Sequence, residues 1–181
     1  MAKPEKIVVL DFGGQYNQLI ARRVRESGVY CEILNYAVPI EQWRDESLRG
    51  IILTGGPNSV YAEGAPRMKE EILHLGVPVL GICYGMQLIN DLCGGRVESA
   101  EVREYGHTML CVTDSALFKG VQPETAVFMN HGDRVSVLPK GFTADASTAN
   151  CPIAAFSDVA RGLYGVQFHP EVRHSVEGTT M

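Results

Sequence analysis

The stretch VPVLGICYGMQLINDLCGG, residues 77–95, decides the fold because one strand ends in it and a helix begins. Its first part, VPVLGI, is a short apolar run without period-two alternation, which is typical of a strand covered on both faces. MQLINDL then has the spacing of a helix. Cys83 lies at the junction between Gly81 and Gly85. This order predicts a strand-to-helix connection at the carboxyl edge of a parallel sheet.

Strand and helix patterns alternate through the first half of the chain. We predict strands over residues 6–12, 29–35, 50–56 and 77–82, and helices over 15–25, 66–76 and 86–92. Three such βα units imply a parallel sheet with helices on both faces.

After Gly95 the helical signal fades, and short alternating segments follow: TMLCVT, AVFMN, RVSVLP, IAAFS and GLYGVQF. These predict antiparallel or mixed strands added to the parallel core. No repeat or linker divides the two halves, so residues 1–181 are expected to form a single domain. The predicted fold class is α/β: an open, mixed and mainly parallel sheet, flavodoxin-like, flanked by helices, with additional antiparallel strands in the second half.

The composition excludes several classes of function. The 181 residues are 45% hydrophobic, and 21 acidic against 16 basic side chains give a net charge of -5. No Lys/Arg block is present, so nucleic acid is not an expected ligand. The apolar runs are too short to span a membrane, and the MAKPEK start lacks the apolar core of a signal peptide. Five cysteines without zinc spacing predict reduced thiols, no metal and a cytoplasmic protein.

Cys83 is the predicted nucleophile. GICYG matches, with sulfur in place of oxygen, the GxSxG turn in which a nucleophile occupies a tight bend between strand and helix. Gly81 and Gly85 let neighbouring backbone pass close to that bend, and the positive end of the helix favours a thiolate. The alternative is a buried structural cysteine. That alternative is preferred for the cysteines without such surroundings, Cys31, Cys93, Cys111 and Cys151.

A thiolate nucleophile needs a base, and His169 is the predicted one. GLYGVQFHPEV ends a strand pattern with His169 and Glu171 two positions apart, so both side chains lie on one face of an extended segment. The carboxylate can then orient the imidazole and stabilise its charge. His131 and His174 compete for this role without so well placed a carboxylate. His74, in a helix, and His107, in a loop, are expected to be structural or solvated.

The reaction also needs N–H donors for a developing oxyanion. ILTGGPNS, residues 52–59, is a strand followed by a Gly-Gly-Pro turn whose amides can point outward. We predict the backbone N–H groups of Gly56 and Tyr84 as the pair. A plain structural turn is the alternative for this motif taken alone.

TGGPNS, GICYGMQ and GVQFHPE, in this order, resemble the three signature blocks of the class I glutamine amidotransferase domain. The resemblance extends from about Lys6 to the C-terminus. It implies the glutamine amidotransferase fold and a triad of Cys83, His169 and Glu171 that hydrolyses the side-chain amide of glutamine. Further residues match positions that hold the amino-acid end of glutamine: Gln87, Asn130, Gly132 and Asp133.

Within this family, residues 11–33 and the NHGD and HPEVRHS stretches are most similar to the glutaminase portion of GMP synthases. The resemblance implies a partner, a synthetase (ATP-pyrophosphatase) domain or subunit, which uses ATP and Mg and is not contained in these residues. It implies no cofactor in this domain. Two alternatives stay open: the glutaminase of another amidotransferase, such as anthranilate synthase, and a non-catalytic interaction module of the same fold. The chain reads DFGGQ at 11–15, where GMP synthases usually read DFGSQ.

Overall fold

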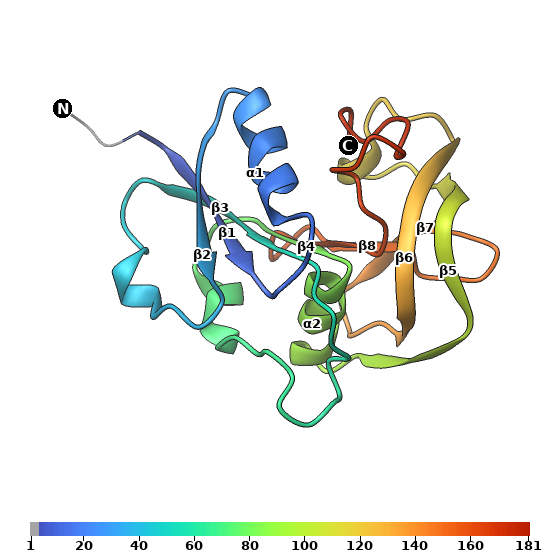
Figure 1. Cartoon of the computed structure of the whole chain (residues 1–181), viewed down its shortest axis with the longest axis horizontal. Helices are drawn as coiled ribbons and strands as arrows, with labels where there is room; N and C mark the ends of the chain where they lie inside the picture. The colour runs from blue at the N-terminus through green and yellow to red at the C-terminus, as the bar shows by residue number, and fades with distance from the viewer. Residues whose placement is uncertain (1–3) are drawn as a thin grey trace.

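A computed structural model describes residues 4–181, so the first three residues of the MAKPEK start lie outside it. The described chain forms one nine-stranded sheet in the order β2-β1-β3-β4-β9-β8-β7-β5-β6 (Figure 1). The strands are β1 Lys6–Asp11, β2 Tyr30–Asn35, β3 Leu48–Leu53, β4 Val79–Ile82, β5 Arg96–Val112, β6 Glu124–Val137, β7 Thr143–Ser147, β8 Ala155–Asp158 and β9 Leu163–Val166. The helices are α1 Asn17–Glu26 and α2 Tyr84–Leu92, with 3-10 turns η1 Ile40–Gln42, η2 Glu70–His74 and η3 Ala116–Phe118.

The parallel half of the sheet runs from β2 to β9, and the two α-helices cover its opposite faces (Figure 1). Alternate residues of β1 point to opposite sides, so Leu10 joins a core cluster with Met86 of α2, while Val9 joins a second cluster with Ile20 of α1. All four side chains are at most 3% exposed. The predicted α/β class is therefore confirmed.

The second half of the chain supplies the antiparallel strands. β5 and β6 form a long hairpin at one edge, and β7 and β8 connect it to the centre. The chain then returns to the parallel core, because β9 pairs in parallel with β4 and antiparallel with β8. The predicted mixed sheet is thus confirmed, and β9 sets the segment after Val166 beside the end of β4.

Some predicted elements were wrong. Residues 66–76 do not form a full helix: Lys69 is extended, with φ -70° and ψ 135°, and only η2 follows it. Ile72 and Leu73 are buried within this short turn. AVFMN and RVSVLP belong to the single strand β6, His107 lies in β5 rather than in a loop, and β7 was not predicted. No helix within residues 4–181 is long and apolar enough to cross a membrane.

Candidate active site

Cys83 occupies the turn between β4 and α2. Its φ of 53° and ψ of -106° make it the only non-glycine residue among those described whose φ is positive. Such a backbone costs on the order of 1–3 kcal/mol and persists only when its surroundings impose it. Here the Cys83 N–H donates to the carbonyl of Val166 at 2.8 Å, which ties the turn to the end of β9. The strain holds the sulfur at the N-terminus of α2.

Gly81 and Gly85 are needed on either side of Cys83 because backbone passes too close for a side chain. A Cβ at Gly81 would lie 2.4 Å from the carbonyl carbon and oxygen of Gly85. One at Gly85 would lie 2.4 Å from the carbonyl oxygen of Leu53. Both distances are below van der Waals contact, so the predicted role of the two glycines in the bend is confirmed.

His169 and Glu171 meet directly, with His169 Nδ1 and Glu171 Oε1 2.7 Å apart. They lie just after β9 in a turn rather than on a regular strand. The His169 N–H donates to the Phe128 carbonyl at 3.0 Å, and the Ser175 hydroxyl donates to the His169 carbonyl at 2.6 Å. The pairing expected from the sequence is therefore present, but β6 and the C-terminal segment hold it.

The environment of His169 favours its protonated form. Burial alone would lower the pKa of His169, but hydrogen bonds to Cys83 and Glu171 outweigh burial and raise this pKa to about 10. The Tyr16 ring packs edge-on against the imidazole with ring centroids 5.0 Å apart. Burial and the nearby Tyr105 and Glu171 raise the pKa of Tyr16, which keeps its hydroxyl neutral. The raised pKa thus favours an imidazolium beside the Glu171 carboxylate.

The Gly55–Gly56 turn lies against the nucleophile and the base. A Cβ at Gly55 would be 3.4 Å from His169 Cε1 and 3.7 Å from Cys83 Cβ. At Gly56 a Cβ would be 2.7 Å from the Phe12 carbonyl oxygen, so this position accepts no side chain. Within residues 4–181, the N–H groups of Gly56 and Tyr84 donate to no protein acceptor. Both amides are free to bind an oxygen.

A cavity of about 540 Å³ joins these groups, which is the size range of a small-molecule site. The predicted glutamine-binding residues Gln87, Asn130, Gly132 and Asp133 all line it. Their side chains are partly engaged already. Asp133 accepts hydrogen bonds from the hydroxyls of Ser59 and Tyr61, and the Gln87 amide nitrogen donates to the Asp133 carbonyl at 3.0 Å. These hydrogen bonds therefore tie the segment after β3 to Asp133 of β6.

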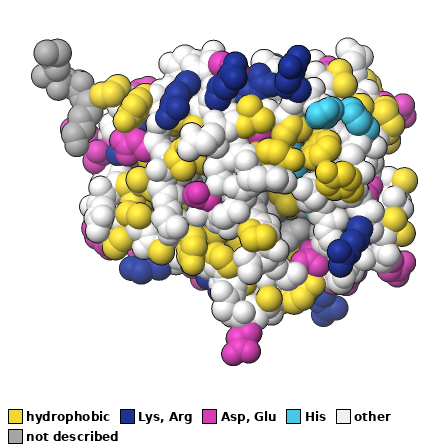
Figure 2. All heavy atoms as spheres, viewed as in Figure 1, with side chains coloured by type: hydrophobic (Ala, Val, Ile, Leu, Met, Phe, Trp, Pro, Cys, Tyr) yellow, Lys and Arg dark blue, Asp and Glu magenta, His cyan; other side chains and the backbone are white. Residues whose placement is uncertain are grey.

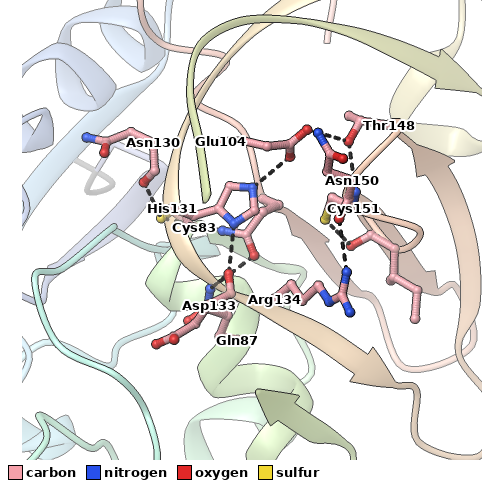
Figure 3. Close-up of polar contacts among 12 residues, drawn as sticks. Cys83, Gln87, Glu104, Asn130, His131, Asp133, Arg134, Thr148, Asn150 and Cys151 are labelled. Carbon is pink, nitrogen blue, oxygen red and sulfur yellow. Dashed lines mark hydrogen bonds and ion pairs between the residues drawn. The ribbon is translucent and has the colours of Figure 1, made fainter. Parts of the chain in front are cut away.

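A second group of Cys, His and Glu side chains lies nearby: ligand atoms of Glu104, His131 and Cys151 are within 4.8 Å of one another (Figure 3). His131 Nε2 and Glu104 Oε2 are 2.9 Å apart, and His131 Nδ1 lies 2.8 Å from the Asp133 carbonyl oxygen. Both ring nitrogens therefore have partners. Cys151 is fully buried away from the cavity, and burial raises the pKa of its thiol to about 12. This group lacks an accessible nucleophile, and His131 has no free nitrogen to act as a base.

Three residues in this region were not singled out in the sequence. Gln167, inside GVQFHPE, places its amide nitrogen 3.5 Å from Cys83 Sγ. Glu104 partners His131, but nothing in VREYGH distinguishes it from a surface acid. Arg103 lines the cavity, with its Nε 3.4 Å from where a Cβ at Gly132 would lie. Of these three residues, only Gln167 lies inside one of the signature blocks, so only Gln167 could have been identified from the sequence.

Comparison with known families identifies the class of protein to which this fold and this arrangement of residues belong. Residues 8–181 match the family described as "Glutamine amidotransferase class-I", and the chain belongs to that family. A glutamine amidotransferase of Thermotoga maritima, 22% identical, shares the fold with a TM-score of 0.72 over 94% of this chain and 78% of that one.

More similar relatives are GMP synthases. The chain is 53% identical to GMP synthase [glutamine-hydrolyzing] of Caldanaerobacter subterraneus subsp. tengcongensis and 54% identical to that of Lachnospira eligens. The alignments cover 98% of this chain but 35% and 34% of those proteins, so it spans about a third of their length. The crystal structure of a proposed GMP synthase subunit from Thermoplasma acidophilum is 34% identical, with a TM-score of 0.83 over 99% of this chain and 90% of that one.

Proposed function

We propose that this chain hydrolyses the side-chain amide of glutamine, with Cys83 as nucleophile, His169 as acid and base, and Glu171 as the group that orients and charges the imidazole. One observation carries the proposal. Cys83, at the N-terminus of α2, and His169 line the same cavity and both lie against Gly55, and His169 in turn contacts Glu171 at 2.7 Å. The order nucleophile, base and carboxylate is that of a hydrolytic triad.

In the first half-reaction, the Cys83 thiolate attacks the Cδ carbonyl carbon of glutamine. The carbonyl oxygen becomes an oxyanion, which accepts hydrogen bonds from the free N–H groups of Gly56 and Tyr84. His169 gives its proton to the departing nitrogen, and the C–N bond breaks. Ammonia leaves, and a glutamyl thioester remains on Cys83.

In the second half-reaction, the now neutral His169 takes a proton from water, and the hydroxide attacks the thioester carbon. The same two amides stabilise the second oxyanion. The C–S bond breaks to release glutamate and regenerate the thiolate beside an imidazolium. We place the amino-acid end of glutamine against Gln87, Asn130, Gly132 and Asp133, which line the cavity on the side of β6 and α2.

We further propose that the ammonia serves the conversion of XMP to GMP by a synthetase domain or subunit that uses ATP and Mg. The support is the 53–54% identity to GMP synthases over 98% of this chain, against 22% for the Thermotoga maritima amidotransferase. This similarity favours a GMP synthase over the glutaminase of an anthranilate synthase. The retained Cys83, His169 and Glu171 argue against a non-catalytic module.

An exposed apolar surface beside the site suits a protein partner. Figure 2 shows hydrophobic and histidine side chains gathered over the β5, β6 and C-terminal region. Tyr105 is 80% exposed, and its ring contacts Phe128 with centroids 5.8 Å apart. Phe128 contacts Tyr16, which packs on His169. A partner bound here would therefore touch side chains that lead directly to the base.

The test is glutamate release by the chain and by its Cys83→Ala variant. Cys83→Ala should lose the activity entirely, because no other group can form the thioester. Cys111→Ala is the matched control, since Cys111 is exposed and outside the cavity, and it should behave as wild type. Glutamate release by a folded Cys83→Ala chain at the wild-type rate would refute the proposal.

A further inference from the structure

Gln167 is buried beside Cys83, yet the two half-reactions assign it no role. It follows β9 directly and is 0% exposed. Its backbone N–H donates to the Ala154 carbonyl at 2.8 Å, which anchors it to the chain before β8. Its side-chain Nε2 lies 3.5 Å from Cys83 Sγ, and its Oε1 lies 3.0 Å from Gln87 Nε2. A buried amide thus bridges the nucleophile and the following helix.

The hydrogen-bond partners decide which end of the Gln167 amide faces the sulfur. Gln87 Nε2 lies 3.0 Å from the Asp133 backbone oxygen, which can only accept, so this end of Gln87 must be the NH₂ group. Its second N–H points at Gln167, whose facing atom must therefore be the acceptor Oε1. The remaining end of Gln167 is the NH₂ group. Cys83 Sγ consequently meets a donor rather than an acceptor.

The Asp133 carbonyl at the far end is itself held firmly. His131 Nδ1 contacts it at 2.8 Å, and His131 Nε2 contacts Glu104 at 2.9 Å (Figure 3). Glu104 Oε1 also accepts a hydrogen bond from the Thr148 hydroxyl at 2.8 Å. The side chains of His131 and Glu104 are 1% and 3% exposed, so water does not compete for these bonds. The Asp133 carbonyl accepts from both His131 and Gln87, and it thereby fixes the orientation of the Gln87 amide, which in turn donates to Gln167.

We infer that Gln167 is a catalytic residue that donates an N–H to the Cys83 thiolate and stabilises it for attack. This inference rests on the proposed function. Among the described residues, the Gln167 amide nitrogen lies 3.5 Å and the Asn130 carbonyl oxygen 3.7 Å from Sγ, and the His169 ring lies across Gly55 from Cys83. A thiol can donate to Asn130, whereas a thiolate accepts from Gln167 and His169. Gln167 therefore shifts the balance towards the reactive form without exchanging a proton itself.

The inference is tested by the rate at which iodoacetamide alkylates Cys83 at pH 7 in the full chain, followed by mass spectrometry of the Cys83 peptide. Gln167→Met keeps the length but removes the donor, so the rate should fall about tenfold to a hundredfold, the range for a hydrogen bond to a charged group. Gln167→Glu keeps the bond from Gln87 but turns a carboxylate oxygen towards the sulfur. Its rate should fall further. Gln42→Met, at an exposed glutamine outside the cavity, is the control and should alkylate at the wild-type rate.

Folding of each variant is followed by circular dichroism, and Gln167→Glu, which keeps the size and the contact with Gln87, decides the matter if Gln167→Met does not fold. The inference would be overturned if Cys83 were alkylated at the wild-type rate in either folded variant. It would also be overturned if alkylation were slower in Gln167→Met than in Gln167→Glu. The alkylation assay does not use glutamine, so its result tests the role of Gln167 separately from the proposed hydrolysis. Loss of glutamate release without a change in alkylation would also overturn it, since Gln167 would then act elsewhere.

Discussion

His169 Nδ1 lies 2.7 Å from Glu171 Oε1, and the two side chains are only 6% and 3% exposed. His169→Asn should lower kcat/KM for glutamate release by about 10³- to 10⁴-fold, because both half-reactions use the same proton carrier. Glu171→Gln should lose less, since an amide can still orient the ring without its charge. Steady-state kinetics measure kcat at saturating glutamine and kcat/KM at limiting glutamine.

The comparison variant is His131→Asn. This variant should chiefly raise KM, because His131 holds the Asp133 carbonyl of β6 and both its ring nitrogens already have partners. A larger loss of kcat in His131→Asn than in His169→Asn would transfer the role of base to His131.

The proton on His169 should make stability depend on pH. Its pKa is raised from 6.5 to about 10, so between these values the folded chain holds a proton that the unfolded chain releases. The contribution is complete below pH 6.5 and is lost as the pH rises towards 10. Urea unfolding at pH 6, 8 and 10 should show a steeper decline for wild type than for His169→Asn, and parallel curves would contradict the raised pKa.

The five thiols should differ in reactivity towards an electrophile that mimics glutamine. Cys83 should be labelled first, because it lines the cavity and faces His169. Burial raises the pKa of the Cys31, Cys93 and Cys151 thiols, which keeps them protonated, and Cys111 is exposed but outside the cavity. Peptide mapping by mass spectrometry gives the order. Labelling of Cys93 or Cys151 before Cys83 would count against the nucleophile assignment.

The bend at Cys83 should tolerate no side chain at Gly81. Gly81→Ala places a Cβ 2.4 Å from the Gly85 backbone, which cannot move without distorting β4 or α2. We expect a loss of at least about 1–3 kcal/mol in the free energy of unfolding, as for an overpacked core. Gly50→Ala in β3 is the matched control, because its Cβ would have an ordinary contact of 3.6 Å with the Pro78 oxygen. Equal stabilities of the two variants in urea would refute this view of the bend.

Glutamate release should be slow in this chain alone and rise when the nucleotide-loaded synthetase partner is added. The Gly56 amide, which we propose as an oxyanion donor, belongs to a turn held partly by the hydrogen bonds of Ser59 and Tyr61 to Asp133, and a partner can reorder that turn. Loss of one oxyanion donor costs about a hundredfold to a thousandfold in rate, so the rise should be of that order. Turnover numbers with and without the partner, at saturating glutamine, measure it. Equal and rapid turnover in both would show that the site is complete without a partner.

Local sequence patterns determined the parts of this protein that depend on neighbouring residues. GICYG predicted the bend because only glycine fits where a Cβ would lie 2.4 Å from neighbouring backbone, and the spacing of His169 and Glu171 predicted their contact. The apolar runs of β1 and β4 predicted buried parallel strands for the same reason: each pattern reports the burial of its own residues.

Only the tertiary structure decided which distant residues meet. β9 pairs beside β4, and this non-local contact brings His169 and Gln167 to Cys83, while the β5–β6 hairpin gives His131 to Glu104 instead. NHGD looks like a break between strands, but pairing of Asn130 with Tyr105 keeps it extended within β6. Residues 66–76 have helical spacing, yet the backbone is extended at Lys69 and only the short turn η2 follows. At these places the free energy of packing between distant segments outweighs the local conformational preference. A local sequence pattern does not show which distant segments will pack together.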